Sequence, residues 1–276
     1  MSGTVLVTGA TGKTGRNLLA QLKAAGVPAR AASRHGAPPF DWAEPATWDA
    51  AIRDVAAVYL VAPMAVDDPY SRMIEFLKLA TRQGVGRFVL LSMASLPAGG
   101  PAHGQVHQWL QDNAADWTVL CPSAFMQNFS EGPSVASIRD EDTIYSNTGD
   151  GRVSFIDVAD IAAAARVALL APAPLNDAFT LTGDDSITYD RVAELIGEAC
   201  GRHITHTKIS MDEMAERLIR RGLPALTARL LAFGYQTVAA GAQDRTTDAV
   251  RTLTGKPPTT FQAFAAANAG AWKSVT

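Results

Sequence analysis

The feature that most restricts how this chain can fold is a glycine-rich turn between an apolar run and an amphipathic segment. Residues 4–8 are β-branched or apolar and predict a buried strand, whereas leucines at helical spacing over residues 18–22 predict a helix that Gly26 ends. The turn between them reads GATGKTG over residues 9–15. Its glycines let the backbone approach a pyrophosphate, whose charge the N–H groups at the helix start attract. This context predicts dinucleotide binding, the alternative being a glycine-rich turn that binds nothing.

Strand and helix signals alternate through the first 122 residues and continue beyond them. After the first strand–turn–helix unit, strands are expected at residues 29–33, 57–61, 88–91, 117–120, 153–156, 178–182 and 204–209. Helices are expected at residues 48–55, 70–83, 104–113, 158–170, 189–200, 211–221, 224–240 and 260–272.

The strands of the first part are apolar throughout, which is typical of strands buried on both faces in a parallel sheet covered by helices. The sequence therefore predicts an α/β fold, a Rossmann-type doubly wound parallel sheet with a smaller C-terminal α/β lobe that binds substrate. We expect the Rossmann domain to cover residues 1–123, completed by about residues 151–171. The lobe is expected to cover residues 124–150 and 172–276.

Composition excludes several classes of partner. The chain has 276 residues, of which 47% are hydrophobic and 18% charged, and its net charge is −3. A chain without a basic excess is poorly suited to the nucleic-acid backbone, and the longest apolar stretch, residues 161–175, is too short and interrupted to span a membrane. Cys121 and Cys200 stand far apart and outside any metal-ligand spacing, so we expect both to be reduced, as in a cytoplasmic protein.

The end of the second strand indicates which nucleotide binds. An NAD site carries Asp or Glu about 20 residues after the turn, but residues 30–35 read RAASRH and hold no acid. Ser33 and Arg34 suit a 2′-phosphate, so the sequence predicts NADP(H), unless Arg34 is simply a solvated surface charge. Asp41 is expected to meet the adenine amino group, unless it caps a turn or helix. The full set of expected cofactor contacts is Gly9, Thr11, Gly12, Lys13, Thr14, Gly15, Ser33, Arg34, Asp41, Ala62, Pro63, Met93 and Pro122.

Several segments together resemble the NmrA-like, atypical short-chain dehydrogenase/reductase family. The likeness lies in TGATGKTG (8–15), Arg34, FDW (40–42), LLSMAS (90–95), TVLCPSAFMQNF (118–129) and GRVSFIDVADIA (151–162), and it extends to about residue 260. Within the family, the pattern is most similar to the triphenylmethane reductase, quinone oxidoreductase and clavine dehydrogenase groups. The resemblance implies a Rossmann domain, a smaller substrate lobe and NADP(H). Many members are reductases, and some only sense the cofactor.

The sequence departs from this pattern at two places. The Tyr-x-x-x-Lys motif of short-chain dehydrogenases is missing, since none of the tyrosines at 59, 70, 145, 189 and 235 has Lys four residues later. Some relatives keep a lysine on the helix before the TVLCP strand, and the matching position here is His103, with His107 one turn later. Cys121 stands where relatives usually have Arg, so any role of that arginine has no counterpart in this chain.

His103 and Ser92 are the candidate catalytic residues. The ordinary pKa of histidine suits proton transfer near neutrality, although a solvated histidine at a helix start is an equally good interpretation of His103. Ser92 either donates a hydrogen bond to the substrate or nicotinamide, or is a polar strand end. His107 shares a face with His103, but a third metal ligand is missing, so no metal is expected.

The expected substrate wall follows Pro122. Its contacts are Phe125, Met126, Asn128 and Phe129, because an aromatic and Met-rich loop fits a flat hydrophobic substrate. The alternative is that these residues form the core of the lobe. Asp157 and Asp160 are expected to be structural, as caps of the helix from residue 158.

Hydride transfer needs a proton donor only where negative charge builds on the substrate. Without Tyr-x-x-x-Lys, the sequence favours an NADPH-dependent reductase of a small, hydrophobic, preactivated acceptor: an iminium, a quinone or a conjugated carbonyl or cation. The alternative is an NADP(H)-sensing regulatory protein without turnover. No nucleic acid or membrane is expected as a partner. The Ala-rich helices near residues 160–170 and 260–270 suit either the core or a homodimer interface.

Overall fold

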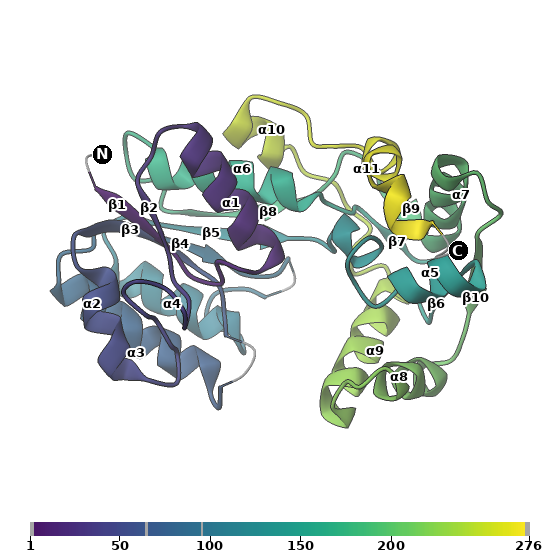
Figure 1. Ribbon diagram of the computed structural model, residues 1–276, viewed down its shortest axis with the longest axis horizontal. Helices are drawn as coiled ribbons and strands as arrows, with labels where there is room; N and C mark the ends of the chain where they lie inside the picture. Colours follow the sequence, from purple (N-terminus) through teal and green to yellow (C-terminus); the bar gives the residue numbers. More distant parts are fainter. Residues whose placement is uncertain (1–2, 64–65, 95, 274–276) are drawn as a thin grey trace. The chain divides into compact units, whose positions relative to one another are not determined.

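The protein, described by a computed structural model over residues 3–63, 66–94 and 96–273, divides into two compact units (Figure 1). Unit 1 comprises Met1–Pro122, Val158–Leu181 and Ala249–Lys256, and unit 2 comprises Ser123–Asp157, Thr182–Asp248 and Pro257–Thr276. The chain therefore passes from one unit to the other five times. In the described residues, no helix combines the length and the hydrophobicity needed to cross a membrane.

Unit 1 is built on a six-stranded sheet in which all pairs of neighbouring strands are parallel. Its order is β2-β1-β3-β4-β5-β8, so the chain moves outward from β1 to β2 and then crosses to the other side of β1. The strands are β1 (Thr4–Val7), β2 (Ala29–Ala31), β3 (Val55–Leu60), β4 (Arg87–Leu91), β5 (Trp117–Pro122) and β8 (Asp177–Leu181). This topology confirms the doubly wound Rossmann-type sheet, and its switch point lies between β1 and β3.

Helices cover both faces of this sheet. Figure 1 shows α1, α6 and α10 on one face and α2, α3 and α4 on the other. Successive side chains of a strand point to opposite faces of the sheet. Val58 and Leu60 of β3 belong to the same hydrophobic cluster as Phe76 of α3, whereas Tyr59 between them does not. The helices are α1 (Lys13–Ala24), α2 (Trp48–Ile52), α3 (Pro69–Arg82), α4 (His103–Asn113), α6 (Val158–Leu170) and α10 (Ala249–Thr254), with a 3₁₀ turn at Pro45–Thr47.

Unit 2 packs short strands and helices around an aromatic core. The rings of Phe129, Phe155, Tyr189 and Phe261 meet edge to face, with centroids 5.3 to 5.7 Å apart. The elements are α5 (Val135–Glu141), β6 (Thr143–Ser146), β7 (Arg152–Val153), β9 (Ile187–Thr188), α7 (Tyr189–Cys200), β10 (Thr205–Lys208), α8 (Met211–Arg220), α9 (Ala225–Ala239) and α11 (Phe261–Asn268), with 3₁₀ turns at Met126–Asn128 and Ala269–Trp272. Strands β6 and β10 pair in parallel, and β7 and β9 pair antiparallel.

The unit limits differ from the expected domain limits. Residues 172–276 were expected to lie in the lobe, but β8 pairs with β5 as the sixth strand of the central sheet, and α10 packs on α6 in unit 1. A five-residue strand carries no local sign of the sheet it joins, so only long-range pairing decides its place. The helix expected to reach residue 55 ends at Ile52, because Asp54 adopts a positive φ of 60° and Val55 begins β3.

A buried arginine closes unit 1 at the amino ends of its strands. The side chain of Arg87, at the start of β4, is almost fully buried. Its Nε donates to Asp116 Oδ2 at 2.7 Å, and its Nη1 donates to the carbonyl oxygens of Leu169 and Ala171 at 2.9 and 2.7 Å. The guanidinium thus satisfies carbonyls at the end of α6 and joins that helix to the entrance of β5.

We expect Arg87→Ala to lower the free energy of unfolding by about 3 kcal/mol, because it leaves Asp116 and the helix-end carbonyls without their donor. Urea unfolding followed by circular dichroism measures the change. Arg72→Ala, which removes an exposed pair with Glu75, serves as the control and is expected to change it by less than about 1 kcal/mol. Equal effects of the two substitutions would contradict this account.

Candidate functional site

The candidate nucleotide site begins with a threonine that joins β1 to β3. Thr8 is fully buried directly after β1. Its N–H and its Oγ1 each donate to the carbonyl oxygen of Tyr59 at 3.0 Å, and the N–H of Val61 donates to Thr8 Oγ1 at 2.8 Å. These bonds hold together the carboxyl ends of the two strands at the switch point, where ligands of such sheets bind.

The turn that follows tolerates only glycine at two positions. Gly9 has a φ of +61°, and a Cβ there would lie 2.9 Å from Cβ of Val61. A Cβ on Gly15 would overlap the carbonyl oxygen of Gly9 and lie 2.8 Å from its carbonyl carbon. The first turn of α1 therefore packs directly on the backbone of the loop, which is the close approach that a dinucleotide turn requires.

The start of α1 fits an anionic ligand. Gly12 occupies the N-cap and makes no side-chain cap, and the first turn of the helix contains no acidic residue. The helix dipole therefore favours a negative charge at this end of α1, where no carboxylate of the first turn would repel a phosphate. The chain thus fits a diphosphate at this corner by its own backbone geometry.

The residues expected to choose between NAD and NADP lie just beyond β2. Arg34 is exposed, and Ser33 is half-buried. The carbonyl oxygen of Ser33 accepts hydrogen bonds from the N–H groups of Gly36 at 3.0 Å and Phe40 at 2.9 Å, so the loop is folded back on itself. Within residues 29–35 the structure places no carboxylate that would repel a 2′-phosphate.

Asp41 has a structural role in this loop. Its Oδ1 accepts a hydrogen bond from the N–H of Ala43 at 2.9 Å, and its carbonyl oxygen accepts one from Trp48 Nε1 at 2.8 Å. Asp41 thus caps a turn, which is the alternative role expected for it from the sequence. Contact of Asp41 with an adenine stays a prediction.

A cavity of about 350 Å³ lies beyond the carboxyl ends of β3 and β4. This volume is within the range of small-molecule sites, about 300–1,000 Å³. The cavity brings together four residues singled out in the sequence, Ala62, Pro63, Ser92 and His103. The other described residues that line it are Val61, Val66, Pro69, Tyr70 and Leu91. Tyr70 was not among the predicted site residues, because it does not belong to a Tyr-x-x-x-Lys motif.

Two polar atoms of this cavity are buried without hydrogen bonds. Ser92 Oγ and His103 Nδ1 have no partner among the described residues. Burial lowers the pKa of the His103 imidazole, so the ring is neutral at neutral pH. The ring of Tyr70 meets that of His103 edge-on, with centroids 5.1 Å apart.

His107 is buried and is not among the described residues that line this cavity. Its ring packs on Trp117 with centroids 5.6 Å apart, and burial lowers its pKa. Over residues 3–63, 66–94 and 96–273, no three His, Cys, Asp or Glu side chains form a cluster that could hold a metal ion.

Met93 and Pro122 lie at neighbouring strand ends of unit 1. The side chain of Met93 is 50% exposed, which is unusual for a residue of its size and hydrophobicity. The carbonyl oxygen of Pro122, at the end of β5, accepts a hydrogen bond from the N–H of Ala94 at 3.1 Å. The segment after β4 is thereby fixed to β5, while contact of either residue with a cofactor stays a prediction.

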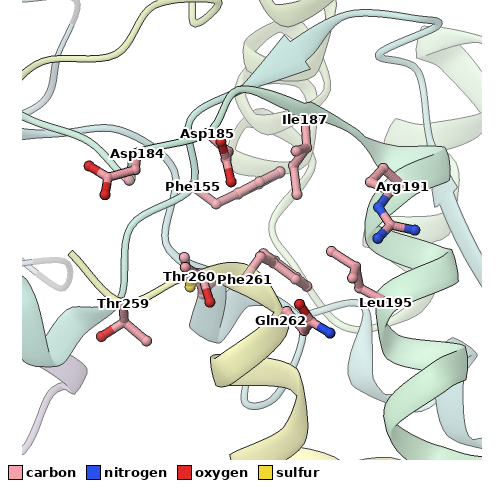
Figure 2. A pocket seen from close by; sticks show the side chains of 12 residues that line it. Phe155, Asp184, Asp185, Ile187, Arg191, Leu195, Thr259, Thr260, Phe261 and Gln262 are labelled. Carbon is pink, nitrogen blue, oxygen red and sulfur yellow. The ribbon is translucent and has the colours of Figure 1, made fainter. Parts of the chain in front are cut away.

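The residues of the expected substrate wall belong to unit 2. Phe129 is only 1% exposed and lies in the aromatic core, which favours the packing role that the sequence analysis left open. Phe125 and Asn128 are half-buried. Met126 lines a cavity of about 170 Å³. In this cavity, Arg191 and Leu195 extend from α7 toward Phe155 and Phe261 (Figure 2). Arg191 is already paired with Glu194 at 2.7 Å.

Comparison with known proteins places the chain among nucleotide-binding oxidoreductases. Residues 9–166 match a family model described as NAD(P)H-binding. The chain is 40% identical to the agroclavine dehydrogenase of Claviceps fusiformis, over 98% of either protein. It is 38% identical to the uncharacterized oxidoreductase YesF of Bacillus subtilis, over 98% of this chain and 96% of that protein.

A solved structure shows the same fold. The NADPH-dependent quinone oxidoreductase QOR2 of Escherichia coli, complexed with NADPH, superposes with a TM-score of 0.82 at 21% identity. The match covers 95% of this chain and 99% of that protein. The likeness extends through both units and confirms the Rossmann-type architecture.

We expect Gly15→Ala to weaken NADPH binding by about 10-fold or more, because the added methyl group pushes α1 away from the loop. Isothermal titration calorimetry measures the affinity, and the circular dichroism spectrum reports the fold. Gly86→Ala is the matched control, since a Cβ at that position meets no atom within 4 Å. Unchanged affinity of Gly15→Ala would contradict the proposed fit.

Proposed function

The chain belongs to the NAD(P)H-binding family and is an NAD(P)H-dependent oxidoreductase, and on that premise we propose that it uses NADPH to reduce a small, hydrophobic, preactivated acceptor. The observation that carries the proposal is the cavity at the carboxyl ends of β3 and β4, next to the switch point of the sheet. This cavity combines an apolar wall with a few polar groups, as small-molecule sites usually do.

The preference for NADPH over NADH rests on the loop after β2. Arg34 offers an exposed guanidinium, and Ser33 a hydroxyl, where an NAD-selective site would present a carboxylate. The glycine turn and the start of α1, whose first turn has no acidic residue, hold the diphosphate. When bound, NADPH supplies the hydride.

The residues of the cavity orient the acceptor and exclude water. Val61, Val66 and Leu91 provide apolar surface, so a planar hydrophobic molecule is favoured. The described lining contains no Tyr-x-x-x-Lys pair and no lysine. We therefore propose an acceptor whose conjugation already lowers the barrier to hydride addition, rather than a simple ketone that depends on a strong acid.

Turnover distinguishes this enzyme from an NADP(H) sensor. We expect the purified protein to oxidise NADPH steadily with an iminium, quinone or conjugated carbonyl acceptor and slowly with simple ketones. Nucleotide fluorescence follows the reaction. Efficient turnover of simple ketones alone would contradict the acceptor class. Tight NADPH binding without turnover of any acceptor would instead favour the sensor.

We expect Arg34→Ala to weaken NADPH binding by about 10- to 100-fold while leaving NADH binding unchanged, because only NADPH carries the 2′-phosphate. Titration of both nucleotides measures the two affinities. Arg82→Ala removes an exposed arginine in the last turn of α3 and is expected to change neither. A parallel loss of affinity for both nucleotides would refute the selector role.

A further inference from the structure

The cavity beyond β3 and β4 holds polar atoms that the protein itself does not satisfy. Ser92 is only 4% exposed, and its Oγ has no hydrogen-bond partner among the described residues. The same holds for Nδ1 of His103, whose ring lines the same cavity. An unsatisfied buried polar group costs about 1–3 kcal/mol, and native proteins seldom keep two together without a function. The pair indicates a place prepared for a hydrogen-bonding ligand.

Tyr70 adds a third polar side chain, and its position is fixed by the start of α3. Pro69 occupies the first turn of that helix, and Asp68 caps it by accepting a hydrogen bond from the N–H of Ser71 at 3.2 Å. The aromatic ring is held edge-on to His103, with centroids 5.1 Å apart. Tyr70 therefore reaches the cavity from a different helix than His103, which begins α4.

The lining of this cavity is electrically neutral. None of its nine described residues is acidic, and none carries a positive charge, since burial holds the His103 ring in its neutral form. The carboxylate of Asp68, one residue from the lining residue Pro69, is exposed and engaged in the cap of α3. A cation placed here would lose its hydration without gaining a counter-charge.

We propose that Tyr70, Ser92 and His103 recognise the acceptor, and that they select an uncharged molecule by hydrogen bonds to an oxygen or nitrogen conjugated with its reducible carbon. The inference rests on the proposed function and narrows its acceptor class. The two hydroxyl groups can donate, and the neutral imidazole offers one donor and one acceptor. The carbonyl oxygens of a quinone or conjugated carbonyl have lone pairs that accept these bonds. The nitrogen of an iminium has no free lone pair, and the nitrogen lone pairs of a dye cation are delocalised into its positive charge.

Binding to the protein saturated with NADP⁺ tests this inference without turnover. We expect menadione, an uncharged quinone, to bind more tightly than crystal violet, a cationic dye, when both are titrated by calorimetry. Tyr70→Phe and Ser92→Ala are each expected to weaken menadione binding by about 3- to 10-fold and to leave the affinity for crystal violet unchanged. Tyr145→Phe, whose ring stacks on Arg217 in unit 2, is the matched control and should leave both affinities unchanged.

The possible outcomes test the proposed function and the selection of uncharged acceptors separately. Failure of NADP⁺ to bind would refute the proposed function itself. NADP⁺ binding together with equal or tighter binding of crystal violet would overturn the selection of uncharged acceptors. Unchanged menadione affinity in both Tyr70→Phe and Ser92→Ala, with circular dichroism spectra like that of the parent protein, would overturn the recognition role of these residues.

Discussion

The nucleotide site depends on the hydrogen bonds by which Thr8 joins β1 to β3. At the switch point, the connections that follow β1 and β3 lead to opposite faces of the sheet, and ligands of such sheets bind in the crevice between them. The bonds of Thr8 hold the carboxyl ends of the two strands side by side at this crevice. The hydroxyl of Thr8 bonds to both the carbonyl of Tyr59 and the N–H of Val61. Gly9 can then turn sharply against Val61, and the first turn of α1 can pack on that loop. The geometry of the phosphate corner follows from these bonds of the Thr8 hydroxyl and from the close backbone approach at Gly9 and Gly15.

Much of the secondary structure of unit 1 could be predicted from the sequence, because the hydrophobic periodicity of each element is contained in its own residues. The apolar run before the glycine turn, the leucines of α1 and the helix over residues 158–170 all have periodicities that need no knowledge of the rest of the chain. The place of β8 was predicted wrongly, since strand pairing is a contact between residues far apart in sequence. The same applies to Arg87, whose burial depends on Asp116 and the end of α6.

The candidate site was foreseen in part for a similar reason. Ala62, Pro63 and Ser92 follow apolar strands, and topology alone brings parallel strand ends together. Tyr70 lies at the start of α3, whose position depends on the cap by Asp68. No short sequence motif predicts the direction of the Tyr70 side chain. Phe129 shows the opposite case: an aromatic residue in a loop motif serves the core of unit 2, because three other rings surround it.

The division of unit 1 among three chain segments bears on how the protein is made. During synthesis, β1 to β5 leave the ribosome long before β8 and α10, which close the sheet and pack on α6. Until residue 181 has emerged, β5 presents an unpaired apolar edge, of the kind that invites association with other nascent chains. Nearly the whole polypeptide must therefore be translated before the nucleotide-binding unit is complete.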